Sequence, residues 1–165
     1  MSVWTSLMWI VIDFTCLVIW TGIVGATAPR WPDRWLQSDP FPLRQYRWET
    51  VRGYRRLGTA WFAKHLPEFG STFGGESKRT LPGTTVADLQ AYLIEVRRAE
   101  WVHWMSLISW LPLMFFGPKW VAYLMTVVAI VLNTPFMLIL RFNHLRLLAA
   151  LKRAQAVGTG PIGST

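Results

Sequence analysis

The stretch WVAYLMTVVAIVLNTPFMLIL, residues 120–140, contains no Asp, Glu, Lys or Arg and decides the class of this protein. A helix that crosses a bilayer needs about 20 mostly apolar residues, so this stretch is long enough. Residues 14–29 and 101–118 are also without these charged side chains, and the first run reaches back to Met1 apart from Asp13. The chain has 165 residues, is 52% hydrophobic and holds 11 Trp, more than a soluble domain of this size would need. We therefore predict an all-α membrane protein with three transmembrane helices, at about 3–28, 101–117 and 119–141.

The distribution of basic side chains predicts how these helices are oriented. Residues 29–100 hold 12 Lys+Arg and residues 141–165 hold four, whereas the connection between the second and third helices has only Lys119. Cytoplasmic segments carry the excess of Lys and Arg. We therefore expect a single, uncleaved multi-pass membrane domain with its N-terminus outside. The segment 29–100 and a basic tail, 142–165, would lie in the cytoplasm.

The segment 29–100 is too short to bury much of a core alone, and we expect it to lie against the bilayer surface. Residues 49–66 place aromatic side chains opposite arginines, as an amphipathic helix on anionic lipid does, although Gly53 and Gly58 weaken this prediction. Residues 67–84 are rich in Gly and Pro and indicate a loop. Thr85 and Asp88 have the spacing of a capping box. They predict a helix that begins at about residue 86 and continues into the second membrane helix.

Polar side chains gather where the predicted helices reach the cytoplasmic face. Glu100 is three residues from His103 on one helix, so the two side chains are neighbours. A carboxylate that orients an imidazole is typical of a general base, which makes His103 the candidate base and Glu100 its orienting partner. Asn143, at the same depth on the third helix, is a candidate donor to an oxyanion. We expect substrate-binding side chains around them: Asp33, Arg34, Arg97, Arg98 and Arg141.

A simpler interpretation is that these residues are the ordinary polar anchors at the ends of membrane helices, since exposed Arg–Glu pairs are common surface features. His144 and His65 are more typical of interfacial or loop histidines. No Cys–His or His-x-x-His spacing is present, so a protein metal site is not expected. Asp13 is costly inside a membrane helix and should face a partner on another helix.

Four stretches in order resemble the bacterial glycosyl-4,4'-diaponeurosporenoate acyltransferases: RWPDRW (30–35), WFAKHLPEFG (61–70), LIEVRRAEWVHW (93–104) and NTPFMLILRFNHLRL (133–147). The matching positions include Asn133 and Pro135, to which we assign no role. The resemblance implies a protein of the bacterial inner membrane that esterifies a sugar hydroxyl of a glycosylated carotenoid, or a similar lipid, with a fatty acyl chain. Acyl-CoA is then the expected co-substrate, and no bound cofactor is expected.

The Gly-, Thr- and Ser-rich end of the chain, from residue 158, favours a different class. Such a tail is disordered unless a partner holds it. The alternative is therefore a non-catalytic accessory subunit of a larger membrane assembly, such as a photosynthetic pigment–protein complex. Other membrane subunits would then contact the helices and the tail. Neither interpretation involves nucleic acid.

Overall fold

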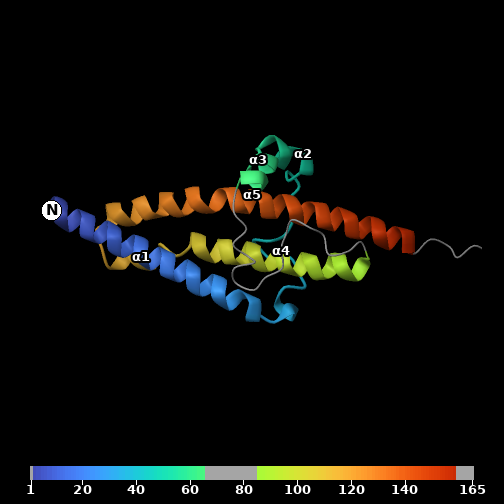
Figure 1. Cartoon of the computed structure of the whole chain (residues 1–165), viewed down its shortest axis with the longest axis horizontal. Coiled ribbons are helices and arrows are strands. Elements are labelled where there is room, and N and C mark those ends of the chain that lie inside the picture. The colour runs from blue at the N-terminus through green and yellow to red at the C-terminus, as the bar shows by residue number, and fades with distance from the viewer. Residues whose placement is uncertain (1, 66–84, 159–165) are drawn as a thin grey trace, which may run out of the picture.

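The computed structural model describes residues 2–65 and 85–158. Three long helices run along the longest axis of the molecule (Figure 1): α1 (Val3–Thr27), α4 (Val86–Leu107) and α5 (Lys119–Gly158). Shorter helices connect them: η1 (Ala28–Arg30), η2 (Asp33–Trp35), α2 (Val51–Arg56), α3 (Thr59–His65) and η4 (Pro112–Phe115). The described ranges contain no strand, so the all-α prediction is confirmed.

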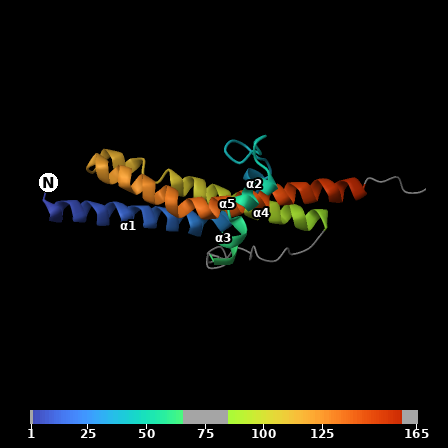
Figure 2. The ribbon, with the colours of Figure 1, turned by 90° about the horizontal axis from the view of Figure 1, so that it is seen from above.

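α4 and α5 run antiparallel and pack along one another (Figures 1 and 2). Their interface holds the hydrophobic core: Leu89, Tyr92, Leu93 and Val96 of α4, with Leu140, Leu147 and Leu151 of α5. On α4 these residues recur at the spacing of one helical face. Residues 142–158 of the predicted basic tail are the last turns of α5. They stay helical beside α4 because Leu147 and Leu151 pack into this core. Residues 159–165, where the partner-held tail was predicted, lie outside the described residues.

The capping box at the start of α4 is confirmed. Asp88 N–H donates to Thr85 Oγ1, and Thr85 N–H donates back to the Asp88 carboxylate, each at 3.2 Å. These reciprocal bonds satisfy two N–H groups that a helix start leaves unpaired. α4 therefore begins at Val86, as predicted.

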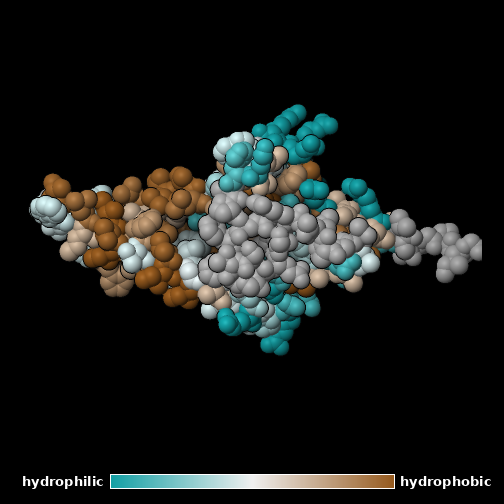
Figure 3. All heavy atoms as spheres, in the orientation of Figure 1, coloured by the Kyte–Doolittle hydropathy of each residue, from teal (hydrophilic) through white to brown (hydrophobic). Residues whose placement is uncertain are grey.

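Two helices could cross a membrane by length and composition, Val3–Arg30 and Lys119–Ala156, which supports membrane association. Together with η4, α1 and residues 119–140 of α5 form what we call the apolar half, which is the brown end in Figure 3. Its outward side chains are large and apolar: Val11, Ile19 and Val131 are each more than half exposed. Trp20 ties α1 to α4 by donating from Nε1 to the Met105 carbonyl at 3.0 Å. Asp13 is buried in α1, and its Oδ2 has no hydrogen-bond partner within the described residues.

The second predicted span, 101–117, does not appear as a continuous helix. α4 ends at Leu107, and turns and η4 follow it. Pro112 has no N–H to extend an α-helix through this region. Ser109 Oγ donates to the Ser106 carbonyl at 2.6 Å, a local bond that competes with helical bonding. The uncharged run is long enough to span a bilayer, but α4 ends within it, where Pro112 and the Ser109 hydrogen bond do not favour a continuous helix.

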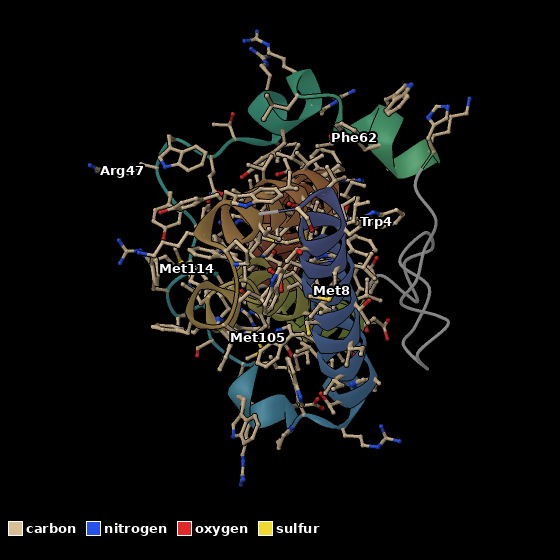
Figure 4. All side chains as sticks on the ribbon, turned by 90° about the vertical axis from the view of Figure 1, so that its left-hand side faces the viewer. Trp4, Met8, Arg47, Phe62, Met105 and Met114 are labelled. Carbon is tan, nitrogen blue, oxygen red and sulfur yellow. The ribbon has the colours of Figure 1, made fainter. Side chains whose placement is uncertain are left out.

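Residues 28–65 form a collar around the middle of the bundle. In the view from the apolar end (Figure 4), the chain passes from η1 and η2 on one side, past Arg47, to α2 and α3 on the opposite side. The single helix predicted for residues 49–66 is divided into α2 and α3. Gly58 lies between them at φ 82°, a left-handed conformation that costs little only for glycine.

Candidate active site

A buried cluster of charged side chains lies between α4, α5 and the collar. Glu100 of α4 is 0% exposed, and its two carboxylate oxygens have partners on α5. His144 Nδ1 donates to Oε1 at 2.8 Å, and Arg141 Nη1 donates to Oε2 at 3.2 Å. The structure therefore gives Glu100 two long-range partners, both on α5. His144 is 1% exposed and lies within α5, so its interpretation as a loop histidine is wrong.

Arg141 joins α5 to the collar. Its Nε donates to Glu49 Oε1 at 2.9 Å and its Nη2 donates to the Arg44 carbonyl at 3.0 Å. Glu49 also accepts from the Tyr54 hydroxyl and from the Tyr46 backbone N–H. Burial alone would raise the pKa of Glu49, but these hydrogen bonds, with that of Arg141 the strongest, hold it below its ordinary value. Burial and the bond to Glu49 raise the pKa of Tyr54 to about 12.

Asp39 of the collar completes the cluster. It accepts from Arg97 Nε, and the Arg97 Nη1 donates to the Leu36 carbonyl at 3.0 Å. His144 Nε2 lies 3.1 Å from the same Asp39 oxygen, close enough for an ion pair although the angles are poor for a hydrogen bond. Only an imidazolium presents N–H groups from both ring nitrogens, so His144 between Asp39 and Glu100 is best satisfied when charged.

Arg98 fixes the beginning of the collar in the same manner. Its guanidinium pairs with Asp33 Oδ1 at 2.6 Å and with Glu95 on its own helix, and it reaches the Trp31 carbonyl at 3.5 Å. Arg97, Arg98 and Arg141, predicted to bind substrate, thus each bind an acid of the collar. Their geometry is that of anchors, and their substrate-binding role stays a prediction.

The charged cluster, as we use the term, contains three acids and three bases: Asp39, Glu49, Glu100, Arg97, Arg141 and His144. With an imidazolium at His144 the formal charges balance, as buried charges require. Within the described residues, no group of three His, Cys, Asp or Glu side chains could hold a metal ion.

His103 lies one turn from Glu100 toward the apolar half and is half-buried. Its Nδ1 is 2.8 Å from Asn133 Oδ1 of α5, and Asn133 Nδ2 donates to the Ala129 carbonyl at 2.8 Å. That second bond turns the amide oxygen toward the ring, so Nδ1 is the nitrogen that donates to Asn133. In a neutral ring the lone pair would then be on Nε2. The ring also stacks on Phe136, with 5.2 Å between centroids.

Asn133 is the site residue that the sequence reasoning did not assign. A signal was present: Asn133 interrupts an apolar run and stands eight residues before Arg141, close to the same face of a helix. Of the remaining predicted residues, Asn143 is half-buried, and its side-chain amide makes no hydrogen bond within the described part of the chain. Arg34 is exposed on the collar.

The family model of glycosyl-4,4'-diaponeurosporenoate acyltransferase matches residues 32–153. Proteins of that name from the Staphylococcus aureus strains MRSA252, USA300 and Newman are 25% identical to this chain over 150 residues, covering 84% of it and 87% of each relative. No solved structure matches. The matched region includes α4, most of α5 and the collar from residue 32. This chain therefore belongs to the glycosyl-4,4'-diaponeurosporenoate acyltransferase family.

Proposed function

We propose that this protein is a membrane acyltransferase that transfers a fatty acyl group to a sugar hydroxyl of a glycosylated carotenoid or a similar lipid. Family membership supports the reaction class, because the relatives are named as acyltransferases of such a compound. The observation that carries the site is the position of His103, half-buried between the apolar half and the charged cluster. A lipid that lies along the apolar half would bring its sugar to this level.

His103 is the general base in this proposal. In the neutral ring, Nε2 takes the proton of the sugar hydroxyl while the hydroxyl oxygen attacks the thioester carbonyl of acyl-CoA. The carbon–sulfur bond then breaks, the ester forms, and the thiolate of coenzyme A takes the proton from the imidazolium. Asn133 holds the ring by accepting from Nδ1–H, the orienting role that the spacing had given to Glu100. Asn143 stands ten residues beyond Asn133 on α5, about 15 Å along the helix axis at 1.5 Å per residue, so its predicted role as oxyanion donor has no part in this step.

Glu100 acts through other residues in this proposal. Its carboxylate holds Arg141 and His144, which in turn hold the collar beside the site. The exposed Arg34 remains the candidate for the phosphates of acyl-CoA, because a guanidinium binds phosphate with two parallel bonds. We further propose a location in the bacterial inner membrane with the N-terminus outside and the collar in the cytoplasm, which the excess of basic side chains supports.

The test is an acyl-transfer assay on the full chain in nanodiscs, with acyl-CoA and a glycosylated carotenoid. General-base assistance contributes roughly 10²–10⁴-fold, so His103→Ala should lower kcat by about that factor. Asn133→Ala should lower kcat less, because the base remains and only its orientation is lost. His65→Ala is the matched control, since His65 is an exposed collar histidine, and it should keep wild-type activity.

Two results would contradict this proposal. Wild-type kcat in a folded His103→Ala variant would remove His103 as the base. An inactive wild-type protein that instead co-purifies with other membrane subunits would favour the accessory-subunit alternative. That alternative was based on the tail from residue 158, almost all of which lies outside the described residues, so it stays a prediction.

A further inference from the structure

The collar separates its charges by sign. Residues 30–65 contain three acids, Asp33, Asp39 and Glu49, and eight basic residues. Each acid pairs with an arginine of α4 or α5: Asp33 with Arg98, Asp39 with Arg97, and Glu49 with Arg141. The acids are therefore used to attach the collar to the bundle.

The eight basic side chains of the collar are placed differently from its acids. They are all exposed: Arg30, Arg34, Arg44, Arg47, Arg52, Arg55, Arg56 and Lys64. Within residues 2–65 and 85–158, none of them forms an ion pair with an acid. Figure 4 shows Arg47 projecting away from the bundle, with the collar passing around the helices from η1 to α3. The positive charge is thus spread along the whole collar, and its densest group is Arg52, Arg55 and Arg56 on α2.

Large aromatic side chains stand among these cations. Trp35, Phe41 and Trp48 are 61%, 78% and 74% exposed, and Trp61 of α3 is 61% exposed. Exposed Trp and Phe beside Arg and Lys are the composition of a surface that lies at the boundary between headgroups and acyl chains. The collar also lies directly beside the apolar half, at the place where the hydrophobic surface in Figure 3 gives way to a hydrophilic one.

We propose that the collar is a docking surface for anionic phospholipid headgroups of the leaflet that the apolar half enters. Charge complementarity selects anionic lipid, and the distribution around the bundle selects a membrane surface over a single bound molecule. Acyl-CoA would concentrate its phosphates at one place, whereas headgroups surround an inserted bundle on all sides. The proposal concerns the attachment of the collar and does not depend on acyl transfer.

The experiment measures the depth of the collar in the bilayer. A nitroxide is attached at Leu57→Cys, an exposed position between α2 and α3, in a Cys16→Ala background because Cys16 is the native exposed thiol. The full chain is reconstituted in nanodiscs of phosphatidylcholine, with and without phosphatidylglycerol. Accessibility of the label to a water-soluble nickel complex should fall severalfold when phosphatidylglycerol is present. The Debye length shrinks from about 10 Å at 0.1 M salt to about 3 Å at 1 M, so high salt should restore the accessibility.

The charge variant removes Arg52, Arg55 and Arg56 of α2 together, each replaced by Gln. Each basic side chain near an anionic surface changes the docking equilibrium by about fivefold, so the three together should change it by roughly a hundredfold. The matched control replaces three exposed basic residues of α5 beyond the collar, Arg146, Lys152 and Arg153, by Gln. It removes the same charge and should leave the response to phosphatidylglycerol unchanged.

Several outcomes would overturn the proposal. One is equal accessibility of the nitroxide at Leu57→Cys, without any charge substitution, in nanodiscs with and without phosphatidylglycerol. This comparison does not depend on the folding of a charge variant. Another is an equal loss of the response in the α5 control. If free coenzyme A protects the label in phosphatidylcholine while phosphatidylglycerol does not, these arginines bind the thioester substrate and not the membrane.

Discussion

Arg141→Met tests whether the charged cluster holds the fold together. The substitution keeps an unbranched apolar side chain and removes the guanidinium that Glu49 and Glu100 share. Glu49 is 5% exposed and Glu100 is 0% exposed, so neither carboxylate regains water without a structural change. Loss of one partner from a buried ion pair costs about 3–5 kcal/mol. Because Tyr54 and His144 still contact these carboxylates, we expect the lower end, about 3 kcal/mol.

The loss should appear in both global and local stability. Equilibrium unfolding in mixed dodecyl maltoside and dodecyl sulfate micelles, followed by tryptophan fluorescence, gives the free energy of unfolding. Arg141 also donates to the carbonyls of Leu43 and Arg44, so its removal should free this part of the collar. Limited trypsin digestion should then cut at Arg44 and Arg47 faster than in the wild type. The stability and the trypsin resistance of Arg141→Lys should lie between those of Arg141→Met and the wild type, because an ammonium keeps the charge but not the planar set of donors.

Arg146→Met is the matched control on the same helix, since Arg146 is exposed. A surface change of this kind should stay within about 0.5 kcal/mol of the wild type. If Arg141→Met lies within about 1 kcal/mol of the wild type and the collar resists trypsin equally, the cluster does not anchor the collar.

Two further changes probe the collar. Burial alone would raise the pKa of Asp39, but its contacts with His144 and Arg97 outweigh burial and hold this pKa well below its ordinary value. The stabilisation by ionised Asp39 is therefore complete above the unfolded-state pKa of about 3.9 and is lost as the pH falls below that value. The difference in free energy of unfolding between wild type and Asp39→Asn should shrink below about pH 4. A constant difference down to pH 2 would contradict this. Gly58→Ala should destabilise α3 by about 1–2 kcal/mol, seen as faster amide exchange, because φ is 82° although the added methyl has room. Gly22→Ala in α1, where the methyl meets nothing within 4 Å, should not destabilise.

The sequence predicted the helices whose limits are set by local chemistry. The Thr85–Asp88 capping box located the start of α4, and the uncharged run 120–140 located the first part of α5. The predictions were wrong where they relied on one local feature of the sequence. The run 101–117 was long enough to span a bilayer, yet Pro112 and nearby serines end the helix inside it. The residues after 141 contain both cations and leucines, and the cations concealed an apolar face that packs on α4.

The candidate site was predicted in its residue types but not in its pairings. Spacing along one helix identified Glu100 and His103 as neighbours, but it cannot show what faces them from another element. The partners Asn133, Arg141 and His144 all come from α5, at least 30 positions away in the chain. Such pairs depend on how α4 and α5 are rotated about their axes, which is decided by the leucine core between them. The anchoring role of the arginines was missed for the same reason, because their acids lie in the collar.

The charged cluster and the collar together determine the depth at which the proposed chemistry would occur. Arg97, Arg98 and Arg141 attach the collar to α4 and α5 at fixed positions along the bundle. If the collar docks on headgroups, the cluster lies at the headgroup level as well. His103 is three residues from Glu100, about 4.5 Å along the helix axis at 1.5 Å per residue, and it lies on the apolar side. The candidate base would therefore lie just beneath the headgroups, where a lipid whose chain enters the apolar half would hold its sugar hydroxyl. A variant that frees the collar, such as Arg141→Met, should then weaken acyl transfer even where His103 is intact.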